Sequence, residues 1–276
     1  MERRDFFRLA GFGAVGVAGA QFLTKAAGSS LPEFAPAGEA LTAKRWAMVI
    51  DVKTLLEKED TDVLIRACHD AHNVPDIPSE DEAVKWIWTE PYEETFPSQA
   101  HEYAESWLQH KEMLVFCNHC DNPPCVRVCP TQATWKRDAD GIVMMDWHRC
   151  IGCRYCIAAC PYGSRSFNWC DPKPHIDSID QDFPHRTRGV VEKCNFCEER
   201  LRVGKLPACV EACQHGALVF GDLADEKSDV RQLLRTRHAL RRKPALGTQP
   251  EVFYLVDDAG EKAAPETGGH AAPDEA

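Results

Sequence analysis

The sequence is poor in positive charge and lacks the motifs of several common protein classes. Its 276 residues contain 32 Lys and Arg against 43 Asp and Glu, a formal net charge of −11. This balance argues against a nucleic-acid partner, because contacts with phosphates require Lys and Arg. The chain has no CxxCH motif for covalent c-type haem, no phosphate-binding glycine loop and no recognisable nucleophile–base pair. Its function must therefore be sought in what the chain has in excess.

Long apolar runs are also missing beyond the N-terminus, and a membrane-spanning helix needs about 20 such residues. The one mildly apolar stretch ends at Leu23 and follows Arg3, Arg4 and the aromatic pair Phe6–Phe7. We interpret residues 1–27 as a twin-arginine export signal, which predicts a periplasmic protein. A retained membrane anchor and a buried helix are the alternatives. Any lasting contact with a membrane would then depend on partner subunits.

The rest of the chain predicts one mixed α+β domain over residues 44–256. Residues 28–43 are small, polar and interrupted by proline, and they are interpreted as a linker. Strands are expected at 45–51, 83–88, 113–116 and 251–256, with a hairpin around Asp140-Gly141. Helices are expected within 98–112 and 225–243. The tail, residues 257–276, has the composition of a disordered segment.

Cysteine is the residue in excess, with fourteen copies. Twelve of them form three groups of four, and Cys68 and Cys170 stand outside these groups. The first group is Cys117, Cys120, Cys125 and Cys129; the second is Cys150, Cys153, Cys156 and Cys160; the third is Cys194, Cys197, Cys209 and Cys213. A chain of this length does not need disulfides to fold, and zinc sites usually use two CxxC pairs.

The spacing of the second group favours an iron–sulfur cluster over disulfides or a zinc site. It follows the pattern C-x2-C-x2-C-x3-C-P of bacterial iron–sulfur proteins, in which three thiolates hold one cluster and the fourth holds another. Cys129-Pro130 repeats the ending of Cys160-Pro161, so the first two groups form a reciprocal pair. The predicted ligands of cluster 1 are Cys117, Cys120, Cys125 and Cys160. Those of cluster 2 are Cys150, Cys153, Cys156 and Cys129.

With these motifs, the chain resembles the electron-transfer subunits of molybdopterin oxidoreductases and of quinone-linked membrane complexes. The segments CNHCDNPPC, DGIVMMDWHRCIGC and CVEACQHGAL carry the resemblance. It implies tandem bacterial-ferredoxin-like [4Fe-4S] modules with hairpin and loop insertions. The inner pair of clusters would lie within residues 113–165, and the outer module would combine 44–75 with 190–222. Within the family the chain is most similar to the DsrO type, the periplasmic subunits of DsrMKJOP complexes.

The family pattern also implies a role for the solitary Cys68. A fourth cysteine group would fall between Asp51 and Asn73, but its three upstream slots fall among Leu55, Lys58, Thr61 and Leu64, which offer no thiolate. Only the last member remains, so Cys68 is predicted to complete cluster 3 with Cys194, Cys197 and Cys209. The alternative is a small buried apolar residue. Cys213 is then a spare thiol and Cys170 a loop thiol, unless carboxylates among residues 57–62 rescue a fourth cluster.

The predicted function is electron transfer through three [4Fe-4S] clusters, with no catalytic site in this chain. The resemblance implies two partners, an NrfD-type membrane subunit that reacts with menaquinone and a multihaem cytochrome c, in a complex of dissimilatory sulfur metabolism. The alternatives are an electron-transfer subunit of a molybdopterin enzyme, such as polysulfide or tetrathionate reductase, and a zinc scaffold without redox activity.

Overall fold

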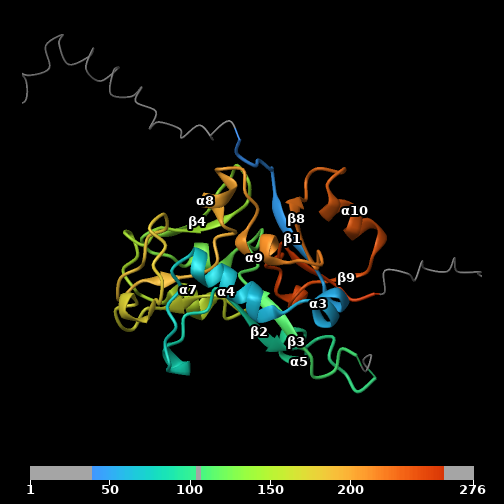
Figure 1. Cartoon of the computed structure of the whole chain (residues 1–276), viewed down its shortest axis with the longest axis horizontal. Coiled ribbons are helices and arrows are strands. Elements are labelled where there is room, and N and C mark those ends of the chain that lie inside the picture. The colour runs from blue at the N-terminus through green and yellow to red at the C-terminus, as the bar shows by residue number, and fades with distance from the viewer. Residues whose placement is uncertain (1–38, 104–106, 258–276) are drawn as a thin grey trace, which may run out of the picture. The chain divides into compact units, whose positions relative to one another are not determined.

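The computed structural model describes residues 39–103 and 107–257 (Figure 1). Its largest sheet has the order β8-β1-β10-β9. Strand β1 (Trp46–Asp51) is parallel to β10 (Val252–Leu255) and antiparallel to β8 (Leu218–Asp222), and β9 (Ala239–Leu240) forms the far edge. Met48 lies opposite both Val252 and Phe220. The run from Trp46 to Ile50 is buried throughout, as expected for a central strand covered on both faces.

Two helices follow β1, and side-chain caps start both of them. Asp51 accepts a hydrogen bond from the amide of Thr54 at the start of α3 (Val52–Lys58), and Asp60 accepts one from Asp62 at the start of α4 (Thr61–Ala71). Helix α4 packs against α9 (Ala208–Ala212), and the two lie side by side in Figure 1. Helix α10 (Asp229–Thr236), capped by Ser228, covers β8 and β1.

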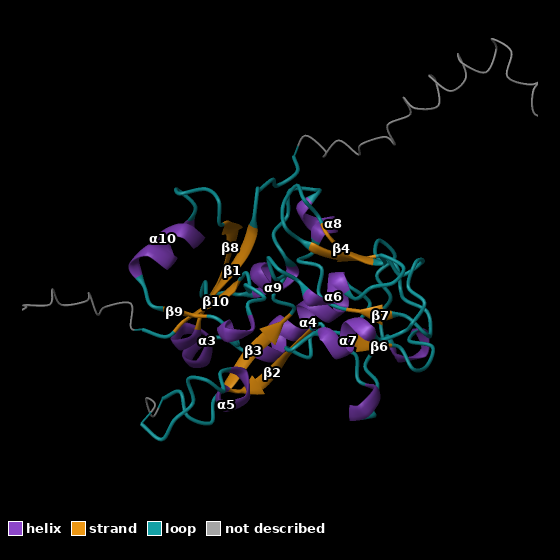
Figure 2. Cartoon of the chain, turned by 180° about the vertical axis from the view of Figure 1, so that it is seen from behind, coloured by secondary structure: helices purple, strands orange, loops and turns teal. Residues whose placement is uncertain are grey.

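The remaining strands form three short antiparallel pairs. The pairs are β2 (Ile87–Pro91) with β3 (Glu112–Phe116), β4 (Thr134–Lys136) with β5 (Val143–Met145), and β6 (Ser166–Phe167) with β7 (Val191–Glu192). Short helices connect them: α5 (Tyr92–Thr95), α6 (Pro124–Arg127), α7 (Tyr155–Ala159) and α8 (Glu198–Leu201), with 3-10 turns at Glu80–Glu82, Lys173–His175 and Pro244–Leu246. Figure 2 shows α6 and α7 next to each other, and they are in contact.

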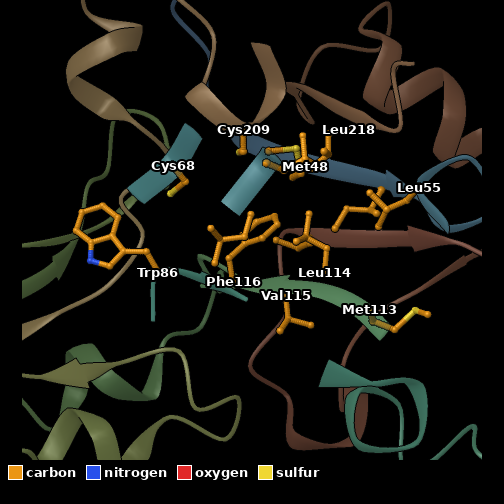
Figure 3. Packing of buried hydrophobic residues seen from close by; sticks show 14 of the residues in the cluster. Met48, Leu55, Cys68, Trp86, Met113, Leu114, Val115, Phe116, Cys209 and Leu218 are labelled. Carbon is orange, nitrogen blue, oxygen red and sulfur yellow. The ribbon is translucent and has the colours of Figure 1, made fainter. Parts of the chain in front are cut away.

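One hydrophobic core joins the large sheet, α4 and the β2–β3 hairpin. Figure 3 shows part of it, with Cys68, Cys209 and Phe116 around Met48. The long loop before β7 is tied to this core by a fully buried ion pair, in which Arg186 Nη2 lies 2.6 Å from Glu192 Oε2. The indole of Trp86 donates a 2.7 Å hydrogen bond to the same carboxylate oxygen.

The structure agrees with most of the expected elements. It confirms the strands at β1, β3 and β10, the hairpin around Asp140-Gly141 and a helix after residue 222. The helix expected within 98–112 is wrong for the described residues there, which form turns and loops. The apolar residues of that segment have helical spacing, but His110 has a positive φ of 58°, which a right-handed helix does not contain. The strand expected at 83–88 begins only at Ile87. Arg3, Arg4 and most of the tail lie outside the described residues.

Candidate metal centres

The structure brings the four predicted ligands of cluster 1 around one cavity. Its lining includes Cys117, Cys120, Cys125 and Cys160, together with Arg165. These cysteines come from the end of β3, the following loop, helix α6 and the end of α7. Cys160 therefore reaches the cavity from the second cysteine group, as the reciprocal pattern predicts.

A second cavity collects the four predicted ligands of cluster 3. Its lining includes Cys68, Cys194, Cys197 and Cys209, with Met48, Ile87, Phe116, Phe196 and Pro207 around them. Helix α4 carries Cys68 and helix α9 carries Cys209, so the contact between these helices closes the set. Burial and the neighbouring thiols raise the pKa of Cys68 well above its ordinary value. Four thiols in one apolar cavity, three of them on buried residues, fit a metal cluster, because a metal deprotonates thiols that would otherwise stay neutral.

The cluster 2 residues lie nearer the surface. Cys156 is buried and packs with Cys150, Val143 and Val191, whereas Cys129, Cys150 and Cys153 are half-buried. Around Cys129, backbone amides of Thr134, Thr131 and Ala133 donate hydrogen bonds that outweigh burial and lower its pKa. Helix α6 belongs to the first cysteine group and α7 to the second, and their packing brings these two groups together.

Left-handed backbone conformations shape the cysteine loops. His119, Arg154, Phe196 and Cys197 have φ values of 41°, 63°, 57° and 52°, in a region that non-glycine residues seldom adopt. Cysteine sulfurs in these loops accept amide hydrogen bonds: the N–H of Phe196 donates to Cys194 Sγ at 3.5 Å, and that of Ala208, at the start of α9, donates to Cys197 Sγ at 3.3 Å. Amide hydrogen bonds to sulfur are one of the factors that set a cluster's reduction potential.

Two buried cations accompany the cysteines, and the sequence patterns did not single them out. Arg165 lines the cluster 1 cavity and donates to Thr134 Oγ1 at 2.8 Å. Lys193 Nζ donates to the carbonyl oxygens of Val143 and of Cys194, the latter at 2.7 Å. Burial lowers the pKa of Lys193, while the sulfurs of Cys117 and Cys194 oppose this shift. Within the described residues neither cation has a carboxylate within ion-pair distance, and the cysteine sulfurs act electrostatically on both of them.

His119 is neutral and structural in this arrangement. Its ring stacks on Phe196 with centroids 3.7 Å apart, and its Nδ1 accepts the N–H of Val143 at 3.1 Å. Burial and the nearby positive charges of Lys193 and Arg165 lower its pKa well below the ordinary value. It therefore holds the loop between Cys117 and Cys120 against the third cysteine group.

Another set of metal-binding side chains overlaps the second cavity. His72, Cys197 and Glu199 bring their ligand atoms within 4.8 Å of one another. However, His72 Nε2 is already 2.9 Å from Glu199 Oε1, and His72 Nδ1 is 2.6 Å from the carbonyl oxygen of Cys68. Cys197 belongs to the set of four thiols, so these contacts are better described as a brace between α4 and α8.

The comparisons with known proteins agree with this geometry. Residues 112–174 and 180–223 match the family model of the 4Fe-4S dicluster domain. The chain is 38% identical to the Hdr-like menaquinol oxidoreductase iron–sulfur subunit 1 of Archaeoglobus fulgidus, over 92% of this chain and 97% of that protein. It is 37% identical to the NrfC homologue of Haemophilus influenzae, over 85% and 90% of the two chains. A tetrathionate reductase subunit of Salmonella typhimurium matches over about half of each chain, at 49% identity.

The chain belongs to this family of iron–sulfur subunits. Relatives in it are named as subunits of a menaquinol oxidoreductase and of a tetrathionate reductase, and the dicluster domain together with the cysteine sets supports [4Fe-4S] clusters as the cofactors of this subunit.

The region where the family pattern would place a fourth cysteine group is packed with other side chains. Leu55 and Leu64, near the missing upstream cysteines, are fully buried in the hydrophobic core. Cys213 Sγ donates a 3.1 Å hydrogen bond to Glu59 Oε1, and Glu59 lies 3.3 Å from His215 Nδ1. Burial and this hydrogen bond raise the pKa of Cys213, so its sulfur is held as a thiol. The half-buried Cys170 packs at the edge of the main core.

No helix within residues 39–103 and 107–257 combines the length and apolar character needed to cross a bilayer.

Proposed function

We propose that this subunit conducts electrons through three [4Fe-4S] clusters, held by the three cysteine sets in the order cluster 3, cluster 1, cluster 2. When bound, such clusters supply reversible one-electron oxidation and reduction. The observation that carries the proposal is the pair of four-thiol cavities on either side of the end of β3. Phe116 lines one cavity and the adjacent Cys117 lines the other. Cys125, from the cluster 1 set, packs in one hydrophobic group with Cys156, which belongs to the half-buried cluster 2 set.

The protein's own contribution is to hold the clusters, exclude water and balance charge. All four positions of each set are cysteine, which leaves no open ligand position for a substrate. This supports an electron-transfer subunit with no catalytic site of its own. The count of three, rather than four, is supported by the buried leucines and by the hydrogen bond between Cys213 and Glu59.

The iron content of anaerobically purified protein tests this count. Three cubanes give about twelve irons per chain, and four give about sixteen. We expect about twelve irons and three reduction steps by potentiometric EPR. A value near sixteen would show that the altered fourth site still binds a cluster, and colourless protein containing zinc would overturn the electron-transfer function.

As electron donors and acceptors we propose a menaquinone-reactive NrfD-type membrane subunit and a multihaem cytochrome c, in a DsrO-type role in dissimilatory sulfur metabolism. The similarity to subunits named for menaquinol oxidoreductases and to NrfC homologues supports the quinone side. The segments RWAMVID and CHDAHNVP support the DsrO type. Purification from native membranes tests this role, with both partners expected to co-purify.

A second candidate function is the electron-transfer subunit of a molybdopterin enzyme. The 49% identity to the tetrathionate reductase subunit over 146 residues favours it. Co-purification of a large molybdenum-containing subunit, in place of a multihaem cytochrome, would establish this alternative.

Export by the twin-arginine route is part of the proposal, because that route carries folded proteins that already contain their cofactors. Replacing both Arg3 and Arg4 by lysine is expected to leave the protein in the cytoplasm with its clusters intact. Cell fractionation with immunoblotting measures this. Normal amounts of the double variant in the periplasm would refute the export signal.

A further inference from the structure

Four arginine side chains line one surface cavity beneath α10. The cavity has a volume of about 370 Å³ and is lined by Arg45, Arg231, Arg235 and Arg241, with Leu223, Ala224, Leu234 and Phe253 forming its apolar wall. The arginines come from separate places: one precedes β1, two lie on α10 and one follows β9. α10, β8 and β1 lie together on one side of the molecule in Figure 1.

The cavity carries more positive than negative charge. Arg45 forms an ion pair with Glu251 and lies 3.6 Å from Asp121, and Asp121 also pairs with Lys136. Within the described residues, Arg231, Arg235 and Arg241 have no carboxylate within ion-pair distance. This local excess stands out in a chain with a net charge of −11. Like charges that line one cavity repel each other, so a bound anion would relieve an unfavourable interaction.

Several of these side chains are held in place without any ligand. Arg231 Nη1 donates to the carbonyl oxygen of Leu223 at 2.9 Å, and the amide of Arg231 is bonded to the N-cap Ser228. The guanidinium of Arg241 lies over the ring of Phe253, with its carbon 4.4 Å from the centroid. Such preorganisation lowers the entropy lost when a ligand binds. The planar guanidinium groups also have N–H groups available for paired hydrogen bonds to an oxyanion.

We propose that this arginine cavity binds the phosphate group of an anionic phosphate ester, whose apolar part contacts Phe253 and Leu234. A phosphate offers more charge and more acceptor oxygens than one carboxylate, and therefore matches a cavity lined by four guanidinium groups better. The volume is within the range of small-ligand sites. The headgroup of an anionic phospholipid and a free phosphate ester offer this same chemistry. The proposal does not depend on the clusters or on the direction of electron transfer.

Binding to the cluster-loaded, full-length protein tests the proposal. Two probes are used: glycerol 3-phosphate in solution, followed by calorimetry, and vesicles of phosphatidylcholine with or without phosphatidylglycerol, followed by co-sedimentation. Binding of glycerol 3-phosphate identifies a site for free esters. Binding only to vesicles that contain phosphatidylglycerol identifies a lipid-headgroup site. Either result supports the proposal, and failure to bind both probes overturns it.

Matched variants separate the cavity from general charge effects. The Arg231→Gln/Arg235→Gln double variant is expected to weaken binding at least tenfold. The control, Arg127→Gln/Arg188→Gln, makes the same charge change at two exposed positions outside the cavity and is expected to change binding less than twofold. The Arg231→Lys/Arg235→Lys variant keeps the charge but loses the planar guanidinium groups, and its affinity should lie between those of the control and the glutamine variant. An equal loss of binding in the control and in the glutamine variant of the cavity would overturn the proposal. Iron content should be unchanged in every variant, which keeps this test independent of the proposed function.

Discussion

Replacing Lys193 by methionine should lower the reduction potentials of the clusters at both sides of it. The side chain is 1% exposed, its ammonium is 2.7 Å from the carbonyl oxygen of Cys194, and the Cys117 sulfur is among the charges that act on it. A unit charge at a separation of roughly 7 Å and an effective dielectric constant of about 20 contributes roughly 2 kcal/mol. For a one-electron couple, about 1.4 kcal/mol corresponds to about 59 mV. Loss of the cation is therefore expected to lower the potentials of clusters 1 and 3 by roughly 100 mV.

Potentiometric EPR on purified protein measures this shift. Lys205→Met is the matched control, because Lys205 is exposed and lies in the same cysteine segment. Lys193→Gln removes the charge but keeps a hydrogen-bond donor, and so separates charge from packing. Shifts below about 20 mV in both Lys193 variants would refute the reasoning, since a charge this close cannot be screened so completely. An equal shift in Lys205→Met would also refute it.

Three further predictions concern the cysteine sets and their support. Cys68→Ser should lose cluster 3 or convert it to a three-iron form, while Cys213→Ser should leave iron content and EPR spectra unchanged; the reverse result would place the fourth ligand within the third group. Arg186→Met should cost about 3–5 kcal/mol of unfolding free energy, because it leaves the buried Glu192 carboxylate without its countercharge; a cost below about 1 kcal/mol in chemical denaturation would contradict this. Burial opposes ionisation of Glu59, but hydrogen bonds from Cys213 and His215 outweigh it and lower the pKa. A lowered folded-state pKa adds stability that is present above the unfolded pKa and lost as the pH falls, so the melting-temperature advantage over Glu59→Gln should shrink below about pH 4.5. A difference independent of pH would contradict this explanation.

The sequence indicated which cysteines come together more directly than it indicated the parts between them, and the structure gathers the sets predicted for clusters 1 and 3 around one cavity each. Spacing within one group indicates which thiols belong together, because a short CxxC loop can wrap only one face of a cluster. The position of Cys68 followed from the family pattern, and the structure places it with Cys194, Cys197 and Cys209 around one cavity. These inferences depend on local geometry and on a repeated motif, which a sequence displays directly.

The supporting residues could not be predicted in this way. Arg186 and Glu192 form a fully buried ion pair, yet each lies in a stretch whose composition is that of an ordinary surface loop. Lys193 and Arg165 likewise carry charges that a sequence pattern assigns to solvent. Burial of such groups depends on which distant segments pack over them. One signal was available for Lys193, since it directly precedes the first cysteine of the third group.

In the proposed three-cluster subunit, a packed core takes the place of the fourth cluster that the family pattern would hold. A cluster stabilises its module because its thiolates bind metal only in the folded state. Under this proposal the fourth cluster contributes no stability, and Leu55 and Leu64 occupy the core where α3 and α4 meet the sheet. Complete burial of a leucine side chain contributes about 1.5–3 kcal/mol, so the two together offset several kcal/mol of lost metal binding. Glu59 then accepts the hydrogen bond of Cys213, the remaining thiol. Restoring a fourth cluster would therefore require room in a packed core as well as new cysteines, and cysteine substitutions at these positions alone are expected to reduce stability without raising the iron content.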